Sequence, residues 1–275
     1  MEDKIDKACA ARDRDDFVES YRLWKELAEE DPEHLMAYGW AAYRLDHWEE
    51  AQDALERARE LDPNAQIIMQ MLGHVWACRT DKDDAEQFRT AEYWFLKALE
   101  RGKTAPILTM LGAVYVELQN IPRGVESFEE ALKVDENYEE AMYNLAVLKT
   151  DDMPLAAIEL LERAIEIDPD YAIAHQKLGA LHQKQRDVVR AEYHFRRAVD
   201  SDPADYWNYL YLANALAVQK KDEEAENLYE FATQLHPDIE GGKDVFAKFL
   251  EQIGKHKKAS VVRSSARRST EEGKP

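Results

Sequence analysis

The chain has 275 residues and a formal net charge of −20, so it can bury a large core and should repel nucleic acid and anionic membrane surfaces. No apolar run approaches the length of a membrane span, and the first residues lack a signal-peptide core, so we expect no membrane insertion. Cys9 and Cys78 form no repeated pattern, and a reduced, cytoplasmic protein is the simplest interpretation.

Residues 1–32 predict a degenerate first helix pair. The first helix, around residues 3–12, is weakly patterned because Lys4 and Lys7 occupy positions where apolar residues are expected. The second helix is better defined, by a small residue followed by two large ones on one face. Those three residues are Ser20, Trp24 and Leu27.

Between residues 33 and 237, a set of markers recurs about every 34 residues. A small residue lies inside the first helix of each unit, at Gly39, Gly73, Gly112, Ala146, Gly179 and Ala213. A small, a large and a small residue at i, i+4 and i+7 mark the second helix, beginning at Ala51, Ala91, Gly124, Ala157, Ala191 and Ala225. A proline follows most units.

These markers predict two helices in every unit. The i, i+4, i+7 spacing places three residues on one helix face, and the small ones let a neighbouring helix approach closely. Glycine inside a helix costs about 1 kcal/mol relative to alanine, which also suggests close helix contact at those points. A period in this range is typical of a solenoid of stacked units.

The same residues resemble the tetratricopeptide repeat, whose helices carry Leu-Gly-x2-Tyr and Ala-x3-Phe-x2-Ala motifs and are followed by proline. The resemblance covers six units over residues 33–237 and, more weakly, a seventh over residues 1–32. It implies an all-α, right-handed superhelical solenoid of stacked antiparallel helix pairs.

One unit departs from the period. Gly73 and Ala91 are 18 residues apart, whereas Gly39 and Ala51 are separated by 12, so six residues are inserted within residues 79–89. A longer loop or an extra helical turn is the favoured interpretation. A protruding contact element is the alternative, because insertions in repeat proteins map to loops on one face.

The pattern changes after Pro237. Residues 238–258 predict a capping helix, which covers the apolar face that a last repeat would expose. Its apolar stripe consists of Val245, Phe246, Phe249, Leu250 and Ile253. Residues 259–275 are rich in Ser, Arg and Glu and predict a disordered basic tail.

No arrangement of residues indicates catalysis, a metal ion or a cofactor, so we expect a protein that is not an enzyme and needs none of them. The eight histidines form no metal-binding motif, and the glycines form no phosphate-binding loop. Cys78 follows His74 by four residues, but no third group is placed to orient the pair, and we interpret the spacing as coincidence.

The resemblance implies that the first helices of successive units line a concave groove for a peptide or helix of a partner. Carried over by position, the candidate lining is Met36, Trp40, Tyr43, Arg44, Met71, His74, Met110, Tyr143, Asn144, Lys177, Tyr211 and Asn214. For any single aromatic or Met residue, burial in the core is the alternative. For the N-terminal group as a whole we favour a binding surface, because Met and aromatic side chains suit protein recognition.

The sequence therefore predicts a non-enzymatic scaffold or adaptor that binds one or more proteins. The acidic composition indicates partners with basic segments, or else a solvated exterior that serves solubility alone. Two alternative functions fit the same fold: a dedicated chaperone that masks a secreted or assembly substrate, and a regulatory subunit of an enzyme.

Overall fold

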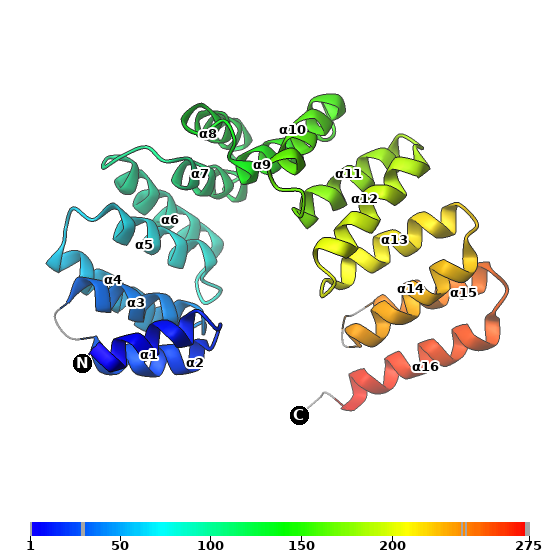
Figure 1. Ribbon diagram of the computed structural model, residues 1–275, viewed down its shortest axis with the longest axis horizontal. Coiled ribbons are helices and arrows are strands. Elements are labelled where there is room, and N and C mark those ends of the chain that lie inside the picture. Colours follow the sequence, from blue (N-terminus) through cyan, green and yellow to red (C-terminus); the bar gives the residue numbers. More distant parts are fainter. Residues whose placement is uncertain (1, 29–30, 238, 240, 273–275) are drawn as a thin grey trace. The chain divides into compact units, whose positions relative to one another are not determined.

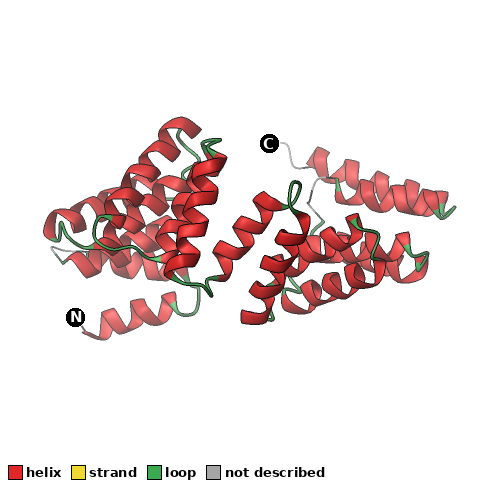
Figure 2. Ribbon diagram, turned by 90° about the horizontal axis from the view of Figure 1, so that it is seen from above, coloured by secondary structure: helices red, strands yellow, loops and turns green. Residues whose placement is uncertain are grey.

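The computed structural model describes residues 2–28, 31–237, 239 and 241–272, and these form sixteen α-helices joined by turns, with no strand among them (Figures 1 and 2). The chain divides into two compact units, residues 1–148 and residues 149–275, named here the N-terminal unit and the C-terminal unit. The all-α fold of stacked antiparallel helix pairs that the repeat predicts is confirmed within each of them.

The N-terminal unit stacks four helix pairs, and in each pair an odd-numbered helix packs on the even-numbered helix that follows it. Its helices are α1 (Glu2–Arg12), α2 (Phe17–Leu27), α3 (Pro32–Tyr43), α4 (Trp48–Leu61), α5 (Gln66–Cys78), α6 (Asp84–Leu99), α7 (Ala105–Glu117), α8 (Ile121–Val134) and α9 (Glu139–Lys149). The predicted degenerate unit over residues 1–32 corresponds to the pair α1–α2.

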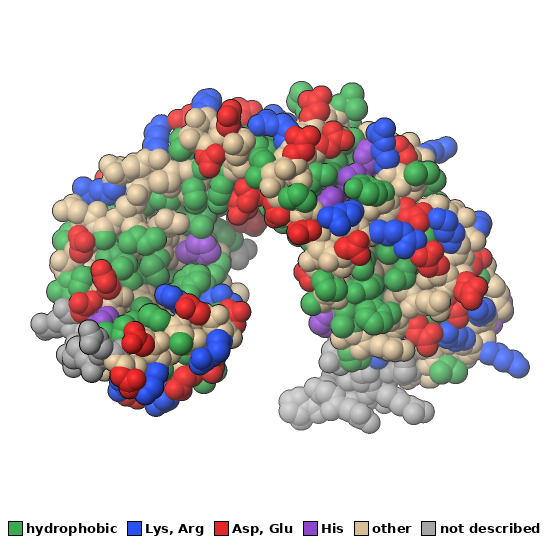
Figure 3. All heavy atoms as spheres, in the orientation of Figure 1, with side chains coloured by type: hydrophobic (Ala, Val, Ile, Leu, Met, Phe, Trp, Pro, Cys, Tyr) green, Lys and Arg blue, Asp and Glu red, His purple; other side chains and the backbone are tan. Residues whose placement is uncertain are grey.

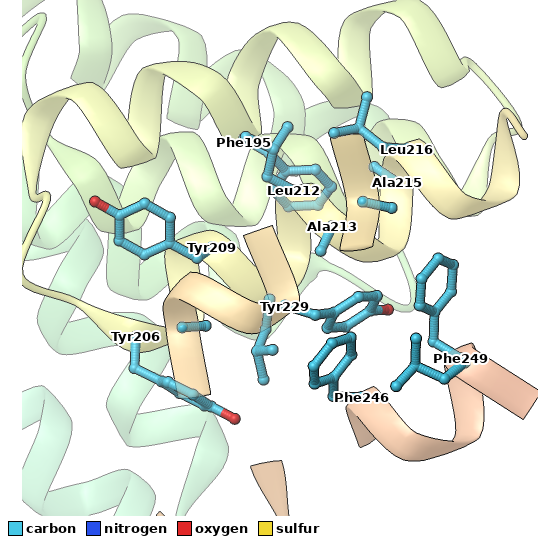
Figure 4. Close-up of a cluster of buried hydrophobic side chains, with 14 of the residues drawn as sticks. Phe195, Tyr206, Tyr209, Leu212, Ala213, Ala215, Leu216, Tyr229, Phe246 and Phe249 are labelled. Carbon is cyan, nitrogen blue, oxygen red and sulfur yellow. The ribbon is translucent and has the colours of Figure 1, made fainter. Parts of the chain in front are cut away.

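The C-terminal unit begins with α10 and continues with three further pairs. Its helices are α10 (Pro154–Ile167), α11 (Ala172–Lys184), α12 (Val188–Ser201), α13 (Tyr206–Val218), α14 (Asp222–Leu235), α15 (Gly242–Gln252) and α16 (His256–Glu272). One cluster of buried side chains in this unit contains residues of all five helices from α12 through α16. In it, Tyr229 packs against both Phe246 and Phe249 (Figure 4).

Glycines set the distance between the two helices of a pair. A Cβ atom added to Gly73, Gly112 or Gly179 would lie 2.7, 2.6 or 2.6 Å from the nearest ring carbon of the phenylalanine on the facing helix. The phenylalanine facing Gly179 is Phe195, which is fully buried. The close helix contact predicted from the repeat is therefore confirmed, because any side chain at these positions would displace a buried ring.

The six-residue insertion lengthens α6 at its start and the loop before it. Helix α6 has 16 residues, and about two turns of it precede the packed residue Ala91. Asp83 caps its first turn. Arg79 in the preceding loop is buried, with its guanidinium paired to Asp81 and hydrogen bonded to Gln52 of α4. A buried cation with several partners fixes the path of this loop.

The end of the chain differs from the prediction. In place of one capping helix over residues 238–258 there are α15 and the start of α16, separated by Gly254 with φ +80°. Residues 238 and 240 lie outside the described residues.

Residues 259–272, for which the composition predicts a disordered tail, continue α16; residues 273–275 lie outside the described residues. Packing and charge explain the order at the start of the segment. Ala259 is buried in the cluster of the C-terminal unit, Lys258 pairs with Glu226 and Glu230 of α14, and Arg263 pairs with Glu251 of α15. Composition alone predicted disorder because these partners are distant in the sequence.

None of the described helices combines the length and the apolar character that crossing a membrane requires.

Replacing Gly179 by leucine should destabilise the chain by about 1–3 kcal/mol, because the new side chain must displace the buried Phe195 ring. Chemical denaturation followed by far-UV circular dichroism measures the loss. Gly102→Ala is the control: its Cβ would meet only Gln66, at an ordinary 3.5 Å. Equal denaturation midpoints for wild type and Gly179→Leu would show that the two helices are not held in close contact here.

Candidate partner-binding site

A cavity of about 310 Å³ opens on the N-terminal unit, between the first helices of three successive repeats. Its walls come from α3, α5 and α7, with one residue from α4. The lining residues are Gly39, Trp40, Tyr43, Leu55, Ile67, Gln70, Met71, His74, Val75 and Met110. The ten include no Asp, Glu, Lys or Arg, and most are apolar. Their one titratable imidazole is that of His74.

The repeat itself explains why these side chains meet. Met71 and Met110 occupy the same position of successive repeats, which brings them to the same face of the stack. Leu55 of α4 reaches the cavity past Gly39, whose added Cβ would lie 2.9 Å from the leucine Cγ. The unbranched thioether side chains can adjust to the shape of an apolar partner.

Aromatic rings support one end of the cavity. The Tyr43 ring centroid lies 5.1 Å from that of Trp40, 5.9 Å from that of Trp48 and 5.8 Å from that of His74. The Tyr43 hydroxyl donates a hydrogen bond to Cys78 Sγ at 3.4 Å. This end is therefore held in place before a ligand arrives.

Burial keeps the polar groups at this end uncharged. It raises the pKa of Tyr43, and it lowers the pKa of His74, in each case because the charged form loses its hydration. At neutral pH the cavity therefore presents a neutral imidazole and a neutral phenol among apolar walls. This surface suits an apolar side chain and disfavours a buried charge.

Five of the predicted lining residues gather at this cavity: Trp40, Tyr43, Met71, His74 and Met110. Met36 of α3 and Arg44, which caps the end of α3, do not line the cavity. Met36 is partly buried against the core of the unit, and the exposed Arg44 guanidinium lies 3.9 Å from the Phe17 ring centroid.

The other five predicted residues lie elsewhere. Tyr143 and Asn144 are on α9, where the Asn144 side-chain amide donates to the Glu140 carbonyl. Lys177 is on α11, and Tyr211 and Asn214 are on α13 of the C-terminal unit, where Asn214 Oδ1 accepts a hydrogen bond from Tyr229.

The prediction missed other wall residues, including Leu55, Ile67 and Val75. Ile67 had a usable signal, since it precedes Met71 by four residues and so shares its helix face. Leu55 had no such signal in its own helix, because it is the large residue of the second-helix marker, and that residue is expected to be buried in every unit. Only the absence of a side chain at Gly39 brings it to the cavity.

The N-terminal unit carries most of the negative charge. Residues 1–148 contain 33 Asp and Glu against 17 Lys and Arg, a net charge of −16, which leaves −4 for residues 149–275. In the space-filling view, hydrophobic side chains gather over the middle of this unit and charged ones over its lower end (Figure 3). The apolar cavity therefore belongs to the strongly acidic unit.

The described residues hold no cluster of three side chains placed to bind one metal ion. Cys78 Sγ lies 4.0 Å from His74 Nδ1, beyond the distance that activates a nucleophile by hydrogen bonding. The geometry at this pair thus gives no support to a catalytic role.

Comparison with known families matches three separate stretches of the chain. Models described as tetratricopeptide repeat match residues 35–65 and 105–138, and one described as TPR repeat matches residues 156–185. The first two stretches contain nearly all of α3–α4 and all of α7–α8, and each coincides with one unit of the repeat. The third contains nearly all of α10 and all of α11, which are the second helix of one unit and the first helix of the next.

Known proteins of similar sequence or fold also include repeat proteins of this kind. ETO1-like protein 1 of Arabidopsis thaliana is 25% identical over 213 residues, which cover 76% of this chain and 23% of that protein. A chain of the APC/C hetero-tetramer Cut9–Hcn1 has a TM-score of 0.70 at 15% identity, over 88% of this chain and 48% of that one. A TPR repeat-containing protein of Cytophaga hutchinsonii has a TM-score of 0.58 at 15% identity, over 84% and 91% of the two chains.

This chain thus spans about a quarter of the plant relative and about half of the first structural neighbour. At 15% identity the structural neighbours show the fold alone. Repeats of this kind stack into extended surfaces that bind other proteins. The recurring markers, the stacked helix pairs and the matching repeat models together show that the chain contains tetratricopeptide repeats.

Proposed function

We propose that the chain is a protein-interaction adaptor whose N-terminal unit holds a segment of a partner protein at the cavity between α3, α5 and α7. The observation that carries the proposal is an uncharged, largely apolar cavity that is open to solvent and walled by Trp40, Met71 and Met110. At about 310 Å³ it lies at the lower end of ligand pockets, a size that suits an anchoring side chain rather than a whole domain.

The occupant is a segment with one large apolar side chain flanked by lysine or arginine. The apolar anchor follows from the uncharged walls, because burying a charge there would leave it unpaired. The basic flanks follow from the net charge of −16 on residues 1–148. Complementary charge speeds association and selects among partners, while the anchor supplies most of the affinity.

The adaptor role we propose is non-enzymatic and cytoplasmic. It needs no catalytic group, and the free thiols of Cys9 and Cys78 suit a reducing compartment. The same cavity would serve a chaperone or a regulatory subunit, but no feature of the described residues favours either over an adaptor.

Replacing Trp40 and Met110 together by alanine should weaken peptide binding at least about 30-fold, because a buried anchor contributes about 2 kcal/mol or more and the contributions of two neighbouring anchors need not add. The probes are peptides selected by the wild-type chain from a random displayed library. Fluorescence anisotropy measures their affinity. Selected sequences should share a large apolar residue with basic neighbours.

The matched control is Trp207→Ala with Tyr211→Ala, which removes two exposed aromatic side chains from α13 of the C-terminal unit. It should leave the affinity within about threefold of wild type. Both double variants should keep the wild-type denaturation midpoint. Loss of binding in the control, and retention in the Trp40 and Met110 variant, would move the site to the C-terminal unit and contradict the proposal.

The charge component makes a separate prediction. A selected peptide with lysine flanks should bind more tightly than its glutamine-flanked counterpart at about 0.05 M salt. The difference should disappear near about 1 M salt, where the Debye length is about 3 Å. Titration calorimetry across the salt series measures both affinities. Equal affinities at low salt would remove the preference for basic flanks and leave the cavity as the whole binding determinant.

A further inference from the structure

Three histidines are buried together in the C-terminal unit, and none of them lines the cavity described above. His175 and His182 lie on α11 and His194 on α12, with exposed fractions of 3%, 1% and 7%. The His182 and His194 rings stack with centroids 5.4 Å apart and planes inclined by 8°, and the His175 centroid lies 5.3 Å from that of His194. Parallel rings direct their nitrogens side by side, so they do not converge on one metal ion. We call this group the histidine cluster.

Hydrogen bonds require His175 to be neutral. His175 Nε2 lies 3.1 Å from the Pro169 carbonyl, which can only accept, so this nitrogen carries the proton. His175 Nδ1 must then accept from His194 Nδ1, 3.1 Å away. Protonating His175 would place two N–H groups against each other. Among the described residues, neither ring nitrogen of His182 has a hydrogen-bond partner.

The repeat shows that the fold does not need histidine at these positions. In the next repeat, 34 residues later, Tyr209, Leu216 and Leu228 occupy the positions of His175, His182 and His194. Tyr209 and Leu216 are buried in the apolar core, and Leu228 packs against it. One repeat therefore carries three histidines where the next has one tyrosine and two leucines.

The charges around the cluster do not offset its burial. Arg190 of α12 disfavours a proton on His182 and His194, and Arg197 of the same helix disfavours one on His175. Four acidic side chains act in the opposite direction: Glu162 of α10 and Asp187 of the α11–α12 turn on His182, and Asp168 and Asp170 before α11 on His175. Helix α13, which also packs here, contains no charged residue.

Taken together, these effects disfavour a positive charge on any of the three histidines. Loss of hydration is the largest cause throughout: it lowers the pKa of His175 and of His182, and it lowers the pKa of His194 to about 4. The closed cluster therefore stays neutral at pH values where exposed histidines are charged.

We propose that the histidine cluster is an acid-sensitive contact that holds α11 against α12 at neutral pH and releases it in mild acid. Opening the contact exposes the rings to water, where each titrates near about pH 6.5 and binds a proton that the closed form excludes. The contact is therefore fully stable above about pH 6.5 and loses stability as the pH falls toward about 4. This device does not depend on the proposed partner cavity.

Hydrogen exchange of the full chain, read by mass spectrometry at pH 7 and pH 5 and corrected for intrinsic rates, tests the proposal. Going from pH 7 to pH 5 should reduce the protection of α11 and α12 against exchange. We expect a reduction of about 20-fold for each histidine that is neutral while the α11–α12 contact is closed. Helices α3 and α4 serve as the internal reference. His182→Leu with His194→Leu copies two of these three positions of the next repeat and removes the hydrogen bond to His175 Nδ1. It should keep most of the pH 7 protection, and the fall in protection at pH 5 should be at most the contribution of His175.

The control His256→Gln removes an exposed histidine and should behave as wild type. An equal fall in protection in wild type and in the His182 and His194 variant would overturn the proposal. If that variant fails to fold, NMR titration of the wild-type rings decides. Rings of His182 and His194 that stay neutral to about pH 5.5, and become charged only as α11 loses protection, support the contact. Rings that become charged near pH 6.5 with α11 still protected refute it.

Discussion

The contact between a small residue on the first helix of a repeat and a large side chain on the second is the constraint on which the structure depends. At Gly73, Gly112 and Gly179, the glycine leaves room for one buried phenylalanine ring and nothing larger. This distance fixes each helix pair, and stacked pairs then bring equivalent positions of successive repeats to one face. The cavity follows directly, because Met71 and Met110 meet only when their repeats stack in register.

The sequence predicted the helix pairs well because their determinants are local and repeated. Spacings of three, four and seven residues, and a period near 34, need no knowledge of tertiary structure. The sequence says less where partners distant along the chain decide the structure. Composition favours disorder for residues 259–272, yet Ala259 is buried and Lys258 pairs with Glu226, 32 residues earlier. The buried Arg79 and its partner Gln52 escaped notice for the same reason.

The candidate site was predicted in part. Position within the repeat identified five residues that the cavity brings together, because first-helix positions are regular. Lys177, Tyr211 and Asn214 lie in the C-terminal unit, and their place in one groove with Trp40 stays a prediction. Helical spacing also gave no sign that His175 and His182 are buried against His194. Helical spacing gives the face of a residue but not what covers that face.

The central claim is that the cavity on the N-terminal unit receives an apolar side chain of a partner. The most direct measurement is the methyl spectrum of methionine-labelled full-length chain during titration with a selected peptide. The account predicts that the Met71 and Met110 methyl signals shift with saturation, since both side chains line the cavity. The exposed Met153 of the C-terminal unit should stay unchanged. Binding that shifts Met153 and leaves Met71 and Met110 unmoved would contradict the account.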